Sequence, residues 1–352
     1  MPSKLSRIAG GCLIAIATVL PQQRLAAQSP ILTEQSLPGS RTLFIGVSAP
    51  DSQTVWLSGS RGSWARSIDG GVTWHTGQVP GADSVDFRDV HALDQRNAWL
   101  LSIGNGPESR VYRTSDGGEN WTLQFQSDDP SAFYDCFAFW DEAHAVLVSD
   151  AVATRLTIRR TTDGGSSWNL VNGLPEAVSG EGHFAASGTC VVTAGREHGW
   201  FGTGAGGVAR IGRTRDRGAT WSIFPTPIVH NTPSAGITSL VFTDTLNGMA
   251  LGGDLSLPNE FTDNVAVTSD GGESWQLVGR PPFPGPIYGA ASVSGKAGLV
   301  VAVGPRGAAW TSDFGRVWTR LDDRNIWSVG FAPNGRGWMT GPSGRIIRID
   351  WR

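Results

Sequence analysis

Short apolar segments recur along the chain, each bounded by turns rich in Gly, Asp and Ser, and no stretch has the period of a long amphipathic helix. Seven of these segments form a first series, at residues 44–47, 87–90, 136–139, 183–186, 238–242, 289–293 and 327–331. Seven more form a second series, at residues 55–58, 98–101, 145–148, 190–193, 248–251, 299–302 and 337–340. Short strands at such regular spacing predict an all-β repeat fold.

A turn motif, Ser/Thr-x-Asp-x-Gly-x-x-Trp, occurs six times, and we call it the Asp-box turn. We expect the Asp side chain to accept hydrogen bonds from backbone N–H groups one and two residues on, the Gly to adopt a positive φ, and the Trp to bury its ring. The aspartates are Asp69, Asp116, Asp163, Asp216, Asp270 and Asp313, and the tryptophans are Trp74, Trp121, Trp168, Trp221, Trp275 and Trp318. We interpret all of them as structural, because equivalent turns cannot all be catalytic.

The chain has seven first strands and seven second strands but only six Asp-box turns. This difference predicts seven units, the last of which lacks its fourth strand. A β-propeller can close its ring with a strand from the other end of the chain, which removes an exposed sheet edge. Residues 31–36 stand where such a strand should be. We therefore predict one domain over residues 29–352, an all-β seven-bladed propeller of four-stranded antiparallel blades, closed by an N-terminal strand.

Residues 1–28 have the pattern of a cleaved signal peptide. Lys4 and Arg7 precede an apolar run at residues 13–20, and small residues follow at 26–28. The run is too short to span a bilayer, and Cys12 precedes it, which argues against a lipoprotein. We expect cleavage close to Ala27 or Gln28 and a periplasmic or secreted protein.

Removal of the signal takes away three cations and no anions, so the formal net charge changes from −3 to about −6. A mildly acidic chain has no global attraction for nucleic acid or anionic lipid. Forty-seven glycines and 20 prolines agree with a turn-rich β fold.

The repeat map places Cys136 on the first strand of the third blade and Cys190 on the second strand of the fourth. We therefore expect two buried apolar side chains, with a disulfide as the alternative that export would permit. The six histidines have no metal-ligand spacing, and the closest approach to a cluster, Glu181 and His183, is interpreted as coincidence. We expect no metal and no cofactor.

The turn motif lies in a repeat that reads roughly Trp-x-x-Gly…Arg-Thr-x-Asp-Gly-Gly-x-x-Trp. This repeat resembles the photosystem II stability/assembly factor family over about residues 42–352. The resemblance implies an exported or lumenal seven-bladed propeller that acts as an assembly chaperone for a reaction-centre subunit. We therefore expect a monomeric, non-catalytic scaffold that binds another protein or an exported membrane-protein segment, with carbohydrate as a further candidate ligand.

Asp-box turns also occur in sialidases and in propeller glycosidases. The N-terminal arginine motif of sialidases is missing here, and Tyr112, Tyr134 and Tyr288 have no obvious Glu partner in the repeat register. The alternative function is an exported glycoside hydrolase with a carboxylate pair drawn from Glu197, Asp254, Glu260 and Asp263.

The first candidate binding site lies on insertions that we expect on the face opposite the Asp-box turns, at residues 104–109, 195–207 and 252–264. In the longest, Arg196, Glu197, His198, Trp200 and Phe201 combine charge with aromatic area. A solvated loop with Trp200 packed on its neighbour is the alternative.

The second candidate site is a set of arginines at one repeat position, three residues before the Asp of the box. Its members are Arg66, Arg113, Arg160 and Arg213, with Arg348 at the corresponding place in the last blade. An arc of arginines could dock an acidic or carboxylate-bearing partner. In the other interpretation each arginine packs over an aromatic ring or pairs with an acid in the next blade, and four copies of one residue favour this structural role.

Overall fold

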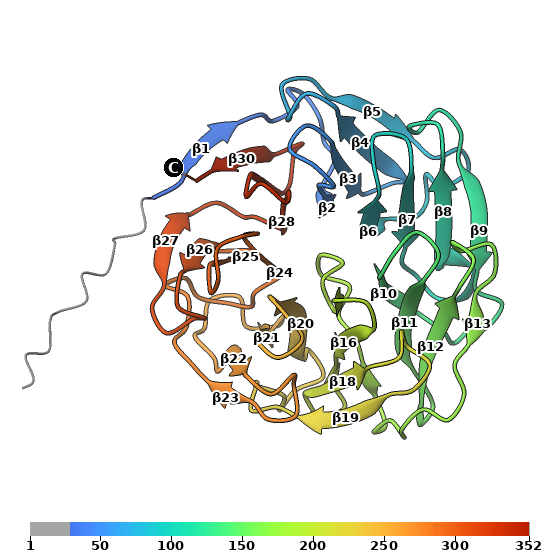
Figure 1. The fold of residues 1–352 in the computed structure, drawn as a ribbon, viewed down its shortest axis with the longest axis vertical. Coiled ribbons are helices and arrows are strands. Elements are labelled where there is room, and N and C mark those ends of the chain that lie inside the picture. Colours follow the sequence, from blue (N-terminus) through green and yellow to red (C-terminus); the bar gives the residue numbers. More distant parts are fainter. Residues whose placement is uncertain (1–28, 352) are drawn as a thin grey trace, which may run out of the picture.

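The computed structural model describes residues 29–351 as seven antiparallel sheets arranged around a central axis (Figure 1). Each sheet forms one blade, and the predicted seven-bladed propeller is confirmed. The signal peptide predicted for residues 1–28 lies outside the described residues. None of the described residues form a helix with the length and apolar character that crossing a bilayer requires.

The first three blades follow one another along the chain. The first contains β2 (Phe44–Ser48), β3 (Val55–Gly59), β4 (Ser63–Ser67) and β5 (His75–Gln78). The second contains β6 (Phe87–Ala92), β7 (Ala98–Ser102), β8 (Arg110–Thr114) and β9 (Thr122–Gln126), with the 3-10 helix η1 (Gly106–Glu108) between β7 and β8. The third contains β10 (Tyr134–Phe139), β11 (Ala145–Val152), β12 (Arg155–Thr161) and β13 (Asn169–Leu170).

The fourth to sixth blades include one insertion. The fourth contains β15 (Val191–Ala194), β16 (His198–Gly202), β18 (Arg210–Thr214) and β19 (Ser222–Pro225). The fifth contains β20 (Ala235–Phe242), β21 (Gly248–Asp254), β22 (Val265–Thr268) and β23 (Gln276–Leu277), and its inner edge is extended by β17 (Gly204–Ala205) and β14 (Glu181–Gly182). The sixth contains β24 (Gly289–Ser292), β25 (Val300–Gly304), β26 (Gly307–Thr311) and β27 (Thr319–Asp322).

The seventh blade draws on both ends of the described chain. Its strands are β28 (Ser328–Phe331), β29 (Gly337–Thr340), β30 (Ile346–Asp350) and β1 (Ile31–Glu34). β1 pairs antiparallel with β30, from Ile31 opposite Asp350 to Glu34 opposite Ile347. Figure 1 shows the two strands side by side at the outer edge of this blade. The pairing gives the seventh blade its fourth strand and so closes the ring.

The Asp-box turns share one hydrogen-bond pattern. In the first, the Ser67 hydroxyl donates to Asp69 and accepts the Gly71 N–H, while Asp69 accepts the Thr73 N–H at 2.9 Å. The other five turns repeat these three contacts. The Asp side chain therefore accepts the backbone N–H four residues further along the chain, and not the N–H groups one and two residues on that were predicted. The N–H two residues on, which belongs to the positive-φ glycine, donates to the Ser or Thr hydroxyl instead.

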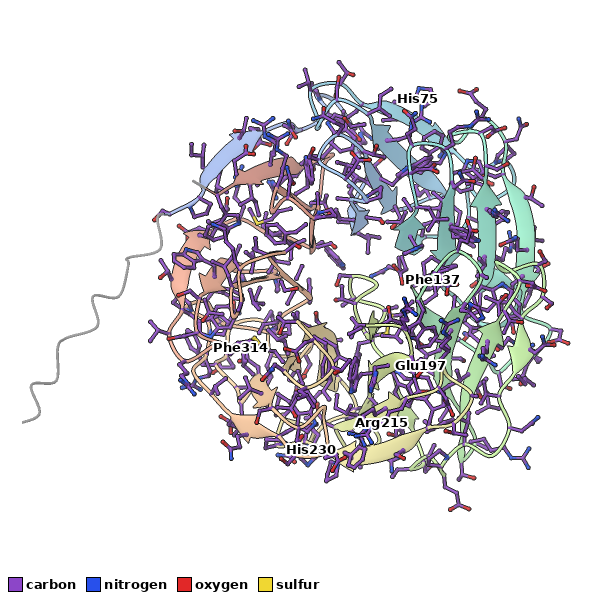
Figure 2. The ribbon with its side chains drawn as sticks, in the orientation of Figure 1. His75, Phe137, Glu197, Arg215, His230 and Phe314 are labelled. Atoms are coloured by element: carbon purple, nitrogen blue, oxygen red, sulfur yellow. A yellow bond between two sulfur atoms is a disulfide. The ribbon has the colours of Figure 1, made fainter. Side chains whose placement is uncertain are left out.

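Side chains from neighbouring blades fill the space between the sheets (Figure 2). Trp56, Trp99, Trp200 and Trp338 occupy the same place on the second strands of four blades and are fully buried. Each buries a large apolar area between two sheets, which is the main contribution of this position to stability.

The fourth blade differs from the sequence prediction. Its first strand is Val191–Ala194 and its second is His198–Gly202, so the segment at 190–193 is an innermost strand and the segment at 183–186 is not a blade strand. Residues 183–186 read as a strand because three of the four are apolar, but they line a pocket at the axis and are not part of a sheet.

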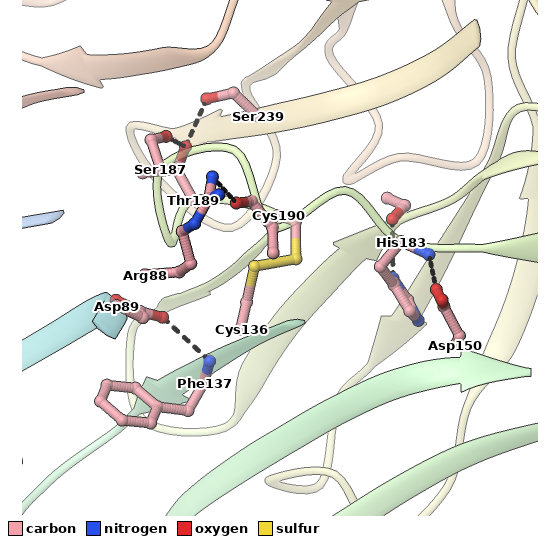
Figure 3. Close-up of a disulfide and its surroundings, with 12 residues drawn as sticks. Arg88, Asp89, Cys136, Phe137, Asp150, His183, Ser187, Thr189, Cys190 and Ser239 are labelled. Atoms are coloured by element: carbon pink, nitrogen blue, oxygen red, sulfur yellow. Dashed lines mark hydrogen bonds between the residues drawn. A yellow bond between two sulfur atoms is a disulfide. The ribbon is translucent and has the colours of Figure 1, made fainter. Parts of the chain in front are cut away.

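This shift also explains a wrong prediction about the cysteines. Cys136 and Cys190 form a disulfide, with Cα atoms 6.0 Å apart (Figure 3). Cys136 lies on the innermost strand of the third blade, and Cys190 directly precedes the innermost strand of the fourth. Innermost strands of neighbouring blades converge at the axis. Cys190 can therefore reach Cys136 because it lies at the start of an innermost strand and not on a second strand.

Candidate functional site

The mouth of the central channel holds a pocket on the face where the innermost strands begin. The cavity has a volume of about 400 Å³, and we call it the mouth pocket. It is lined by residues of the second, third, fifth, sixth and seventh blades and of the inserted segment: Arg88, Phe133, Asp135, Asp150, His183, Phe184, Ala185, Ala186, Leu255, Tyr288 and Trp327. The Asp-box turns lie on the opposite face, because strands alternate in direction within each blade.

Residues 183–189, which we call the crossing segment, run across this mouth between β14 and β15. Arg88 donates to the Ala185 carbonyl at 3.2 Å, and the Ser187 hydroxyl donates to the Tyr288 carbonyl at 2.8 Å. The Trp327 indole N–H donates to the Ala186 carbonyl. Figure 1 shows this segment as a green loop near the centre of the ring. The segment therefore ties the second, sixth and seventh blades together and forms the floor of the pocket.

The position of two charged side chains follows from a repeated irregularity in the innermost strands. Arg88 and Asp135 are each the second residue of such a strand, and each lies at a shift in the pairing register with the next strand. A bulge of this kind redirects a side chain out of the regular alternation. It turns both side chains toward the channel mouth instead of into the space between blades.

Two carboxyl groups meet in the pocket. Asp135 is 1% exposed, and its Oδ2 atom has no hydrogen-bond partner among the described residues. Burial raises the pKa of Asp135 well above its usual range, and the nearby charge of Asp150 raises it further. Burial also raises the pKa of Asp150, against the opposing effect of His183.

His183 lies between this pair and the fourth blade. Its backbone N–H donates to Asp150 at 2.7 Å, and its ring Nδ1 lies 2.9 Å from the Gly202 carbonyl (Figure 3). A carbonyl only accepts, so Nδ1 carries the proton and Nε2 is the free acceptor. Burial lowers the pKa of His183, which favours the neutral ring.

Arg88 and two aromatic rings form the other side of the pocket. The Arg88 guanidinium lies 5.5 Å from the centre of the Trp327 ring, and its Nη2 is 3.9 Å from Asp86. The Tyr288 and Trp327 rings contact each other with centroids 4.8 Å apart. Both rings remain partly exposed, so they offer apolar area to a ligand.

The predicted binding loop at residues 195–207 is divided in the structure into a turn on the Asp-box face, the strand β16 and a short connection, residues 203–207, on the mouth face. Trp200 and Phe201 are fully buried on β16, where Trp200 stacks on Phe242 with ring centroids 3.6 Å apart. Arg196 and Glu197 are exposed in the β15–β16 turn on the Asp-box face, where the Arg217 N–H donates to the Glu197 carbonyl. His198 is half-buried at the start of β16. The prediction was wrong because the segment at residues 190–193 was assigned as the second strand of the fourth blade, whereas it forms the first strand.

Three of the five predicted arginines donate hydrogen bonds to the next blade. Arg66 donates to the Gly117 carbonyl at 2.7 Å, Arg160 to the Arg217 carbonyl at 2.7 Å, and Arg213 to the Gly271 carbonyl at 3.3 Å. Each acceptor is the residue directly after the Asp of the neighbouring Asp-box turn. These contacts join one blade to the next.

The same arginines also lie over aromatic rings. Arg66 is 5.5 Å from the Trp56 ring and Arg113 is 4.9 Å from the Trp99 ring. Arg348 instead pairs with Asp350 on its own strand, at 2.7 Å. The geometry favours the structural interpretation of this set, since Arg66, Arg160 and Arg213 donate to the next blade and Arg113 lies over a ring of its own blade.

None of the carboxylates considered for a hydrolase lines the mouth pocket. Glu197 lies on the Asp-box face, whereas Glu260 and Asp263 are exposed beyond β21. Asp254 is buried; burial would raise its pKa, but hydrogen bonds from Ser256, Ser234 and Thr232 lower the pKa to about 2. It holds its own loop in place. Among the described residues no three His, Cys, Asp or Glu side chains are grouped as metal ligands.

Comparison with solved structures places this fold among propellers of several functions. "YCF48 bound to D1 peptide" has a TM-score of 0.65 at 17% identity, covering 91% of this chain and 97% of that one. YCF48 from Cyanidioschyzon merolae has a TM-score of 0.64 at 18% identity, covering 91% and 98%. A streptogramin B lyase has a TM-score of 0.67 at 12% identity, covering 92% and 98%. No family model matches the sequence, and no curated protein matches it.

Sequence reasoning missed Arg88, Asp135 and Asp150 as pocket residues. A signal was present: Arg88 and Asp135 are charged residues at one repeat position, where the first blade has the buried Ile45. A charge inside an apolar strand is a candidate functional residue.

Proposed function

We propose that this protein is a non-catalytic scaffold that binds a polypeptide segment of another protein at the mouth pocket. The observation that carries the proposal is the pocket itself, a cavity between five blades with aromatic walls, two carboxyl groups of which Asp135 is buried, and an arginine. Mixed apolar and polar linings of this kind are typical of ligand sites on pre-formed scaffolds.

The likeness to YCF48 supports the same function. A propeller of this fold has been solved with a D1 peptide bound, and the repeat motif resembles photosystem II assembly factors. We propose that the chain is a distant relative of that family with a partner of its own.

A selection from a random dodecapeptide library tests the proposal. The full chain should enrich a defined peptide motif, and Trp327→Leu should weaken binding of the enriched peptides at least tenfold. Val72→Ala, an exposed apolar residue of an Asp-box turn on the opposite face, is the control and should leave affinity unchanged. Failure to enrich any motif, or equal binding by Trp327→Leu, would contradict a peptide site at the mouth.

We place this function outside the cytoplasmic membrane, in the periplasm or the medium. The signal-peptide pattern of residues 1–28 and the Cys136–Cys190 disulfide both support export, since disulfides persist in oxidising compartments. Mass spectrometry of the mature protein should give an N-terminus close to residue 28. A mature chain that retains Cys12, or begins there with a lipid, would contradict this location.

An exported glycoside hydrolase is the second candidate, and one observation favours it. Asp135 and Asp150 are neighbouring carboxyls, and burial raises the pKa of Asp135 well above its usual range, as a general acid requires. The streptogramin B lyase neighbour indicates that this fold can also carry an enzyme. Turnover on a glycan panel that is lost in Asp135→Asn would support the enzyme over the scaffold.

A further inference from the structure

The mouth pocket contains more carboxyl groups than its own cations balance. Asp135 and Asp150 both line the cavity, and among the described residues neither has an ion pair. A buried carboxylate without a cation or a full set of hydrogen bonds costs several kcal/mol. The free pocket therefore favours protonated carboxyls, and it would gain from a cation supplied by a ligand.

The basic side chains of the pocket lining, and Arg210 beside Glu181, have other partners. The Arg88 guanidinium donates to the Ala185 carbonyl and has Asp86 as its acidic neighbour, outside the pocket. Arg210 is paired with Glu181, which it approaches through two nitrogens. His183 donates its ring proton to a carbonyl and is kept neutral by burial. None of these groups neutralises Asp135, whose Oδ2 atom stays without a partner.

The remaining walls suit an alkyl chain that ends in a charge. Phe133, Phe184, Leu255, Tyr288 and Trp327 line the cavity, and all of them are partly exposed. Aromatic faces attract cations and also cover methylene groups, as lysine and arginine stems require. The volume of about 400 Å³ exceeds that of one such side chain, so a stem and its head group fit together with water.

We propose that the mouth pocket binds the cationic side chain of a lysine or arginine residue in a partner polypeptide, with the charge against Asp135 and Asp150 and the stem against the aromatic walls. This inference rests on the proposed function, because it names the chemistry of the partner at the same pocket. It differs from the arginine arc, which would select an acidic partner.

Small capped amino acids test the inference directly. Nα-acetyl-lysine-N-methylamide and its arginine counterpart carry the charge on the side chain, whereas Nα-acetyl-norleucine-N-methylamide has a similar stem without charge. Alanyl-alanyl-alanine amide carries only a terminal ammonium. Titrated into the full chain and followed by calorimetry, at least one of the first two should bind saturably, and the norleucine probe at least tenfold more weakly. Equal binding of the norleucine probe, no saturable binding of either basic probe, or binding of the alanine peptide alone would overturn the inference.

Matched variants locate the site. Asp135→Asn should weaken the basic probe at least tenfold, because it removes the charge and keeps the shape. Asp128→Asn should leave the affinity unchanged: its side chain is 90% exposed on the β9–β10 link of the same face, so it controls for the general negative field. If circular dichroism shows Asp135→Asn to be unfolded, Asp150→Asn takes its place. Equal affinity in the folded Asn variant overturns the assignment.

The two proposals fail separately. Library peptides that lack basic residues and bind Asp135→Asn as well as the wild type would overturn this inference and keep the peptide scaffold. A basic probe that binds through Asp135, with no peptide enriched from the library, would keep the cation site and overturn the scaffold.

Discussion

The Asp89 carboxylate accepts the backbone N–H of Phe137 at 3.0 Å, which joins the innermost strand of the second blade to that of the third. Gly188 of the crossing segment packs on the same carboxyl so closely that a Cβ atom there would lie 2.3 Å from Asp89 Oδ1. One buried side chain thus connects two blades and limits the residue allowed in the segment above it.

Asp89 should make stability fall with rising pH. Burial raises its pKa to about 8, against hydrogen bonds from Phe137 and Val90. The folded state therefore binds a proton more tightly than the unfolded chain, and stability present at low pH is lost as the pH rises toward 8. Between pH 6.5 and 8 the loss should be on the order of 2 kcal/mol. Asp89→Asn should remove it, as measured by urea unfolding, while the exposed Asp83→Asn should keep the wild-type slope.

His91 should give the opposite dependence in acid. Its ring stacks on Phe139 with centroids 4.3 Å apart, Nε2 is buried without a partner, and burial lowers the pKa to about 4. The folded state then binds fewer protons than the unfolded chain, so stability present above pH 6.5 is lost as the pH falls toward 4. His91→Phe should raise the melting temperature at pH 5 relative to the wild type, more than it does at pH 7. An equal change at both values would contradict the assignment.

Arg213 and Arg215 offer a matched test of the interblade contacts, because both approach Glu273, at 2.9 and 3.3 Å. Arg213 is 8% exposed and also donates to the Gly271 carbonyl, so Arg213→Gln should destabilise the fold by about 1–3 kcal/mol. Arg215 is mostly exposed, and Arg215→Gln should cost less than about 0.5 kcal/mol. Urea unfolding of the two variants gives the comparison. Equal losses would mean that the Glu273 ion pair, and not the carbonyl contact, is what matters.

The disulfide should contribute to stability through the unfolded chain. It closes a segment of 54 residues, and bridges of this kind typically contribute about 2–4 kcal/mol. The double variant Cys136→Ala, Cys190→Ala should lose that amount in urea unfolding. Added reductant should lower the wild type to the same level and leave the double variant unchanged. A reductant effect of similar size on the double variant would show that the bridge is not responsible.

Local patterns were enough to predict most of the architecture. The Asp-box turns and the apolar strands repeat, and both report on contacts within a blade or between adjacent ones. The count of strands against turns also predicted a closing strand within residues 31–36, and residues 31–34 form it. The fourth blade was misassigned because residues 183–186 are apolar for another reason: they line the mouth pocket and are not part of a sheet.

The site was harder to predict, because it depends on which residues meet at the axis. Asp135 and Asp150 belong to one blade, but Arg88, Tyr288 and Trp327 come from three others, and only ring closure brings them together. Trp200 packs on a neighbouring residue, as the alternative interpretation expected, but it does so from a strand and not from a solvated loop. A repeat pattern indicates the position of a residue within a blade, whereas the pocket is made by departures from that pattern.

The pairing of Ile31–Glu34 with Ile346–Asp350 has a consequence for the order in which this propeller can be completed. A ribosome releases the first of these strands early and the second only after more than three hundred further residues. Until then the early strand has no partner, and the growing molecule presents two unpaired sheet edges, the kind of surface that promotes aggregation. The ring therefore closes only after residues 346–350 have been synthesised, and a chain interrupted before Ile346 cannot form it.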